Sequence, residues 1–176
     1  MRDQPPVGIA LGLLSSESLQ ILQVSRQYRT PAFPAGSGPD YVNSAILCST
    51  KYSCTELLAH LHEVERLVGR TRKKRWEPRI IDLDIIDCAG QIAPDTGIFQ
   101  KWFDLPLDQQ MQHAPEQMIL PHPRVQDRPF VLVPMRDIVP NWVHPVTGLS
   151  LNQMLARFSA GELAEIRPIA DIESTS

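Results

Sequence analysis

A cationic run that leads directly into an alternating apolar segment is the feature that most constrains this chain. Six of the ten residues from 70 to 79 are Arg or Lys, and residues 80–86 read IIDLDII. In a β-strand, residues two apart project from the same face. We therefore expect a strand at 79–88 that turns Asp82 and Asp84 to one side, beside a cluster of cations.

This arrangement of charges indicates a class of ligand. Carboxylate oxygens bind hard cations such as Mg²⁺, while Arg and Lys bind the phosphate oxygens that share the metal. We expect a polyphosphate that carries Mg²⁺, held through Asp82 and Asp84 and the neighbouring cations. The alternative is that the two aspartates only form the polar face of an edge strand, and the pattern alone does not decide between them.

The charge of the rest of the chain limits its partners. The 176 residues carry a formal net charge of −3, and without residues 70–79 the remainder carries −8. Nucleic-acid binders usually spread cations over a whole face, so we expect recognition of one compact anion and no nucleic-acid partner. The length and the ordinary globular composition fit a single domain, residues 1–176.

The cysteines and the hydropathy indicate a compartment. Cys48, Cys54 and Cys88 are irregularly spaced and match no zinc-binding pattern, so we expect free thiols in a reducing cytoplasm. The sequence has no recognisable signal peptide and no run of 18 apolar residues. We therefore expect a cytoplasmic protein without a membrane partner.

Periodicity predicts an α+β protein arranged as a two-layer sandwich. Ser53 with Glu56 three residues later is a capping box, and Gly69 is a stop signal for the helix between them. Residues 95–120 read only as a short amphipathic segment packed on the core. The expected elements are a helix at 5–15, strands at 19–29 and 41–50, the helix ending at Gly69, the strand at 79–88, and helices at 130–138 and 151–158.

Four motifs resemble those of the 6-hydroxymethyl-7,8-dihydropterin pyrophosphokinase family, in the same order. They are YRTP at 28–31, PDYVN at 39–43, RWEPRIIDLDII at 75–86 and LPHPRVQDRPF at 120–130. The resemblance covers residues 19–158 and implies a ferredoxin-like sandwich with a mainly antiparallel sheet. It also implies transfer of the β,γ-diphosphate of ATP to the hydroxymethyl group of the pterin, with release of AMP, in folate biosynthesis. Residues 95–120 would then be an insertion.

The resemblance implies a role for individual residues and a monomer that acts on ATP and hydroxymethyldihydropterin. Asp82 and Asp84 would bind two Mg²⁺, and Arg70 and Arg79 would act with them in catalysis. The residues implied to bind ATP are His122, Arg128, Arg72, Arg75 and Glu65. The residues implied to bind the pterin are Thr30, Pro31, Tyr41, Asn43, Trp76 and Phe130.

The residues alone support simpler interpretations of several of these positions. Trp76 is more simply a core residue, His122 an exposed loop histidine, and Glu65 part of a solvated helix face. Asp87 is five residues after Asp82 and should project from the opposite face of the strand, so we exclude it from the metal site.

Two departures from the family pattern bear on activity and stability. The family normally has Gly where Glu77 stands, and Glu77 adds a negative charge beside the phosphate site. The family's opening strand and its Gly-Ser-Asn-Leu turn are not recognisable here. We expect that strand to lie upstream of Met1 or to be rebuilt, and a chain extended upstream should then melt at a higher temperature.

Three alternatives remain open at this point. A nucleotidyltransferase with a DxD metal site would release pyrophosphate instead of AMP. A degenerate member of the family would bind its ligands without catalysing a reaction, and the presence of Glu77 favours this alternative. A ferredoxin-like RNA binder is opposed by the few strand aromatics and the negative charge.

Overall fold

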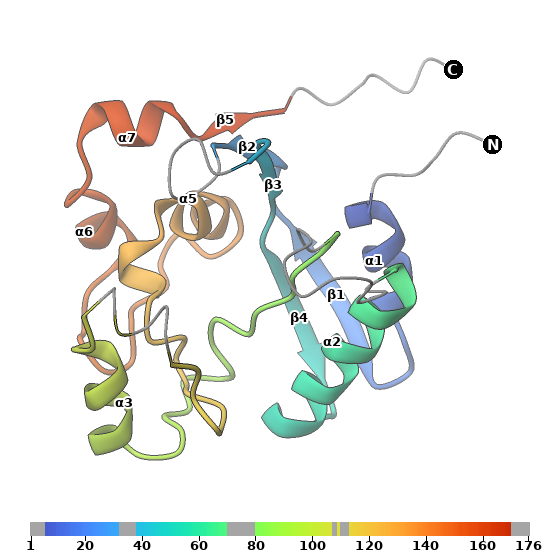
Figure 1. Ribbon diagram of the computed structural model, residues 1–176. Helices are drawn as coiled ribbons and strands as arrows, with labels where there is room; N and C mark the ends of the chain where they lie inside the picture. Colours follow the sequence, from blue (N-terminus) through green and yellow to red (C-terminus); the bar gives the residue numbers. More distant parts are fainter. Residues whose placement is uncertain (1–5, 32–37, 70–79, 107–108, 110–112, 170–176) are drawn as a thin grey trace.

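The computed structural model describes residues 6–31, 38–69, 80–106, 109 and 113–169 (Figure 1). It is an α+β protein with small antiparallel sheets, as predicted. The elements are α1 (Pro6–Leu14), β1 (Leu19–Val24), β2 (Tyr28–Thr30), β3 (Tyr41–Asn43), β4 (Ile46–Thr50), α2 (Cys54–Val68), α3 (Thr96–Phe103), the 3₁₀ turn η1 (Val125–Asp127), α5 (Pro129–Ile138), α6 (Leu151–Leu155), α7 (Ala160–Ala164) and β5 (Arg167–Pro168).

The two long strands predicted at 19–29 and 41–50 are each divided into two. β1 pairs with β4 in one sheet, and β2 pairs with β3 and β5 in another. The division falls at Ser25, whose Oγ accepts a hydrogen bond from Ala45 N at 2.8 Å. The Ser25 hydroxyl thus replaces the backbone carbonyl that would otherwise accept from Ala45 N. A side chain that competes with the backbone in this way interrupts the hydrogen-bonding pattern of a β-sheet.

α2 begins and ends where the sequence predicts. Ser53 Oγ accepts from Glu56 N at 3.3 Å, and the Glu56 carboxylate accepts from Ser53 N at 2.8 Å, which completes the capping box. Gly69 ends the helix with φ of 123°, a conformation that favours glycine. None of the described helices combines the length and the apolar character needed to cross a bilayer.

The strand predicted to carry Asp82 and Asp84 is not part of either sheet, so that prediction is wrong for residues 80–88, which we call the aspartate segment. The alternation itself holds, because both aspartates are exposed. The residues that pack against the core cluster of α1, α2 and β1 are Ile81, Leu83 and Ile85. The sequence pattern therefore predicted which side chains pack against the core, but it did not predict which part of the chain pairs with this backbone.

The aspartate segment joins the two cores of the molecule. Its first half packs on the cluster around α1 and α2, while Ile86 packs on a second cluster formed by β2, α5 and α6. Figure 1 shows the segment in green, running from the side of α1 and α2 towards α3. Because it contacts both cores, any group that fixes its backbone also fixes the aspartates relative to the rest of the fold.

Two backbone groups of the aspartate segment form hydrogen bonds with partners that do not belong to a β-strand. Leu83 N donates to Oε1 of Glu65 on α2 at 2.8 Å, and Glu65 is buried, with 2% of its surface exposed. Ile86 O accepts from His122 N at 2.8 Å. A helix side chain and a loop thus supply partners that a neighbouring strand would otherwise supply.

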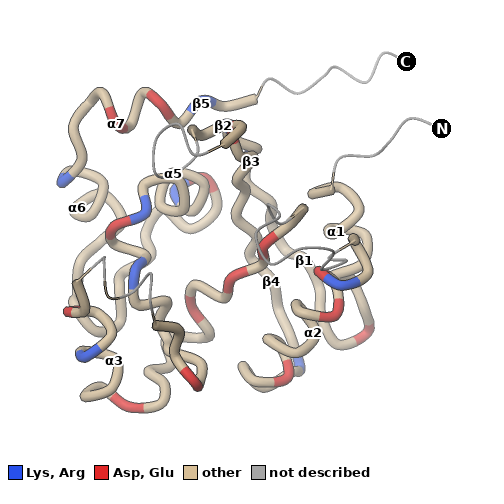
Figure 2. Tube along the Cα trace, in the orientation of Figure 1, with Lys and Arg blue, Asp and Glu red and all other residues tan. Residues whose placement is uncertain are grey.

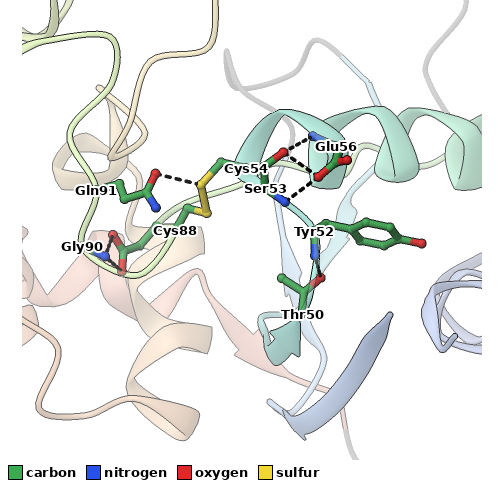
Figure 3. Close-up of a disulfide and its surroundings, with 9 residues drawn as sticks. Thr50, Tyr52, Ser53, Cys54, Glu56, Cys88, Gly90 and Gln91 are labelled. Atoms are coloured by element: carbon green, nitrogen blue, oxygen red, sulfur yellow. Dashed lines mark hydrogen bonds between the residues drawn. A yellow bond between two sulfur atoms is a disulfide. The ribbon is translucent and has the colours of Figure 1, made fainter. Parts of the chain in front are cut away.

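A disulfide fixes the end of the same segment. Cys88 is bonded to Cys54, the first residue of α2 (Figure 3). The prediction of free thiols is therefore wrong for these two residues, which are 34 positions apart in sequence and meet only in the fold. Cys48 is a free thiol, as predicted, and burial raises its pKa.

His144 is a buried titratable side chain with no exposed surface. Its Nδ1 accepts from Val146 N and Thr147 N, both at 3.2 Å. Its ring packs against three aromatic rings, which are those of Phe99, Phe103 and Trp142. Burial lowers the pKa of His144 because the protonated ring would lose its hydration.

Removing the disulfide should lower the free energy of unfolding. Cross-linking a loop of this length restricts the unfolded chain by the equivalent of about 3–4 kcal/mol. We expect Cys54→Ser/Cys88→Ser to unfold at a lower urea concentration than wild type, and wild type in dithiothreitol to behave like the variant. The control Cys48→Ala should keep the full response to reductant. An unchanged midpoint in the double variant would contradict the prediction.

Replacing Glu65 should loosen the aspartate segment. Glu65→Ala leaves the Leu83 N–H without this acceptor, at a cost of about 1–3 kcal/mol, whereas Glu65→Gln retains an acceptor oxygen and should lose less. Amide hydrogen exchange measured by NMR should be faster at Leu83 in Glu65→Ala. The control Glu63→Ala lies on the exposed face of the same helix. Equal exchange rates in the two alanine variants would show that Glu65 does not hold this backbone.

The protein should lose stability in mild acid through His144. The folded pKa of this histidine lies below its unfolded value of about 6.5, so the unfolded chain binds more protons as the pH falls from that value. The contribution of neutral, buried His144 to the free energy of unfolding is therefore complete above about pH 6.5 and declines below that pH. His144→Asn keeps an acceptor near the Nδ1 position and does not titrate. Urea unfolding between pH 7 and 5 should show a shallower dependence on pH in this variant, and an identical slope would rule His144 out.

Candidate functional site

A cavity of about 540 Å³ opens beside the aspartate segment. Four parts of the chain line it: α2, the aspartate segment, the loop from His122 to Arg128, and a wall made of Trp102, His113 and residues 115–119. Five of the residues assigned to metal or ATP from the sequence lie together here, and they are Glu65, Asp82, Asp84, His122 and Arg128. The fold thus brings α2 and two well-separated motifs to one place.

Opposite charges meet within this cavity. Arg128 Nη1 lies 3.3 Å from Asp84 Oδ2, and both side chains keep contact with solvent, with 33% and 46% of their surfaces exposed. Figure 2 shows acidic residues spaced along the aspartate segment. A polyphosphate with its metal carries both charges, so it can bind the arginine and the aspartates together.

The two aspartates suit a hard divalent cation by the chemistry of their donors. Asp82 and Asp84 offer exposed carboxylate oxygens on one side of the segment, as the alternation predicted. Among the residues described, no three His, Cys, Asp or Glu side chains form a metal-binding cluster. Mg²⁺ fits a pair of carboxylates because it keeps several waters and takes its remaining ligands from substrate phosphates.

His122 is partly buried in the cavity wall and is uncharged. Burial is the main cause that lowers its pKa, to about 3, and the positive charge of Arg128 adds to the effect. Its Nδ1 accepts from Arg124 N at 3.1 Å, so the proton of the neutral ring is assigned to Nε2. His122 is therefore a neutral donor for an anionic ligand rather than an exposed loop histidine.

Glu65 lines the cavity but is not on a solvated helix face. It is buried, and its carboxylate accepts from the backbone between the two aspartates. The simpler interpretation of Glu65 from the sequence is therefore wrong. The geometry gives it a part in positioning the aspartate segment, and its assignment to ATP stays a prediction.

The described residues among those assigned to the pterin lie on the β2–β3 hairpin, directly after β2, or at the start of α5. Thr30 pairs with Tyr41 across the hairpin, and Asn43 Nδ2 donates to Thr30 Oγ1 at 2.7 Å. Thr30 is buried, whereas Pro31 and Tyr41 are exposed. Phe130 packs on the second core, two positions after the cavity residue Arg128. None of these described side chains is among those that line the cavity.

Several predicted positions lie outside the described residues. They are Arg70, Arg72, Arg75, Trp76, Glu77 and Arg79. Asp87, which we excluded from the metal site, instead accepts from Gly90 N and from Trp142 Nε1, at 3.2 and 3.4 Å.

Sequence reasoning missed part of the cavity wall. Arg124 lies inside the quoted motif at 120–130 but received no role, although it lines the cavity and pairs with Asp127 at 3.2 Å. Trp102, His113 and residues 115–119 come from the segment at 95–120, which the sequence predicted only as a short amphipathic segment packed on the core. No local pattern indicated that this segment also lines a cavity.

Comparison with known proteins adds an independent line of support. A family model described as 7,8-dihydro-6-hydroxymethylpterin-pyrophosphokinase (HPPK) matches residues 4–140. A Synechocystis protein named 2-amino-4-hydroxy-6-hydroxymethyldihydropteridine pyrophosphokinase is 31% identical over 150 residues, which are 85% of this chain and 66% of the relative. A Methylorubrum extorquens protein of the same name is 27% identical over 154 residues, or 88% of this chain and 84% of the relative.

Some relatives are much longer than this chain. The folic acid synthesis protein fol1 of Pneumocystis carinii is 28% identical over 159 residues, which are 90% of this chain but 19% of that protein. The chain thus spans about two thirds of the Synechocystis relative and about a fifth of the fungal one. The names of these relatives do not favour the nucleotidyltransferase or the non-catalytic alternative. Because the family model covers most of the sequence, the chain belongs to the 7,8-dihydro-6-hydroxymethylpterin-pyrophosphokinase family.

Proposed function

We propose that this chain transfers the β,γ-diphosphate of ATP to the hydroxymethyl group of 6-hydroxymethyl-7,8-dihydropterin, a step of folate biosynthesis. The pterin hydroxyl oxygen attacks the β-phosphorus, the bond from that phosphorus to the oxygen bridging it to the α-phosphorus breaks, and AMP leaves. The proton of the hydroxyl is released to solvent. One observation carries the proposal: in a chain of this family, Asp82, Asp84, His122 and Arg128 line a single cavity.

The chain contributes mainly position and charge, as expected for phosphoryl-type transfer. Asp82 and Asp84 would hold two Mg²⁺, which when bound neutralise the negative charge of the polyphosphate. Arg128 can exchange its pairing with Asp84 for a phosphate oxygen without losing a charged partner. His122 donates from Nε2 and adds no charge. The arginines proposed to assist are Arg70, Arg72, Arg75 and Arg79.

The hairpin provides the proposed contacts with the pterin. One N–H of the Asn43 amide is bonded to Thr30 Oγ1, so Oδ1 and the second N–H remain for the hydrogen-bonding edge of the ring. Phe130 would stack on the ring, Trp76 would form the opposite wall, and Tyr41 and Pro31 would form the rim. The bond to Thr30 fixes which way the amide points before the substrate arrives.

We further propose a ferredoxin-like sandwich within one domain, 1–176, with residues 95–120 as an insertion, acting as a monomer. Asp137 on α5 links this helix to β2, because it accepts from Tyr28 Oη at 2.9 Å, and it also pairs with Arg26, which lies just before β2, at 2.7 Å. A cytoplasmic location remains a prediction. The Cys54–Cys88 disulfide is the feature that argues against a reducing compartment.

Replacing either metal-binding candidate should abolish most of the activity. Asp82→Asn and Asp84→Asn each remove a negative charge where the metal would bind, and we expect kcat to fall about 100-fold or more. The measurement is AMP release from ATP in the presence of the pterin and Mg²⁺. The matched control is Asp87→Asn in the same segment, which should keep most of the activity of the wild type.

The products separate the proposed activity from its alternatives. Wild type should yield one AMP and one pterin diphosphate per ATP consumed. Release of inorganic pyrophosphate would instead show a nucleotidyltransferase, and binding of both substrates without turnover would show a non-catalytic member. A wild-type protein that binds neither Mg²⁺-ATP nor the pterin would overturn the enzyme assignment.

A further inference from the structure

The segment around α3 is a fixed part of the cavity wall. Phe99 is fully buried and packs on the ring of His144, and Asp95 caps the helix by accepting from Ile98 N at 2.9 Å. The base of the segment is closed by two hydrogen bonds between Ala93 and Leu120, both at 3.0 Å. These contacts make α3 a rigid support for whatever side chain it turns towards the cavity.

A third contact ties α3 to the loop that carries the phosphate-binding candidates. Arg124 Nη1 donates to Phe103 O at 3.4 Å, at the last residue of the helix. Arg124 and Trp102 both line the cavity. The end of α3 is therefore held beside the loop from His122 to Arg128, and Trp102 lies next to that contact in the chain.

Trp102 differs from the other aromatic residues of α3. Phe99 and Phe103 contact each other and the ring of His144. Within the described part of the chain, no aromatic ring contacts Trp102, although it is half-buried and lines the cavity. An indole that faces a cavity from a rigid helix and is not covered by another ring offers a flat apolar surface to a ligand.

We infer that Trp102 is the stacking surface for the purine base of the nucleotide, and that it sets the preference of this cavity for a nucleoside triphosphate over a bare polyphosphate. The inference rests on the proposed function, because it assumes that the triphosphate binds at Asp82, Asp84 and Arg128. Those residues recognise charge and hold nothing of the base. A base needs a flat apolar surface of about its own size. An aromatic side chain supplies such a surface by stacking, without hydrogen bonds to the edge of the base.

Two ligands that both carry a triphosphate chain, one with a purine base and one without, test this inference. The probes are Mg²⁺ with α,β-methylene ATP, which is not cleaved, and Mg²⁺ with inorganic tripolyphosphate, measured by calorimetry on the full chain. We expect Trp102→Ala to raise the Kd for the ATP analogue about ten-fold and to leave the Kd for tripolyphosphate unchanged. Trp102→Phe should recover most of the affinity, because it restores an aromatic face.

The control lies on the same helix. Lys101→Ala replaces an exposed neighbour outside the cavity wall and should change neither Kd. A Trp102→Ala variant that binds both probes as wild type does, or that weakens both equally, would overturn the role of Trp102 and leave the proposed function standing. A wild-type protein that binds neither probe would overturn the proposed function and this inference with it.

Discussion

A buried carboxylate, rather than a neighbouring strand, fixes the backbone that carries Asp82 and Asp84. Glu65 reaches from α2 to the Leu83 N–H, which lies between the two aspartates. In a sheet, many equivalent hydrogen bonds share the task of holding a strand, and the loss of one is tolerated. Here a helix side chain holds the backbone between the aspartates, so their position depends on the position of α2. The capping box of Ser53 and Glu56 and the glycine stop at Gly69 set where that helix begins and ends.

Both of the described arginines that line the cavity are already in ion pairs before any ligand is bound. Asp84 is paired with Arg128, and Arg124 is paired with Asp127. His122 is neutral because burial and the nearby arginine both disfavour its protonated form. A ligand that carries anionic oxygens together with cations can replace such pairs without leaving an isolated charge in a partly dry site.

The sequence predicted best what depends on neighbouring residues. The boundaries of α2 follow from Ser53, Glu56 and Gly69, and the exposure of Asp82 and Asp84 follows from alternation alone. It failed where the outcome depends on distant parts of the chain. The pairing partner of the aspartate segment, the bond between Cys54 and Cys88 and the burial of Glu65 all arise from contacts that no local pattern specifies. The resemblance identified His122 and Arg128, whereas Trp102 became visible only through the packing of α3.

The disulfide makes residues 54–88 a closed covalent ring. By sequence, this ring contains Glu65, both aspartates and the whole basic run at 70–79. A single cut in the backbone anywhere inside the ring would therefore leave the protein in one piece, with the two fragments joined through sulfur. Such a nicked molecule would migrate as an intact chain on a denaturing gel and separate only after reduction. The part of the sequence that contains the basic run and both aspartates is thus also the part from which a broken chain does not fall apart.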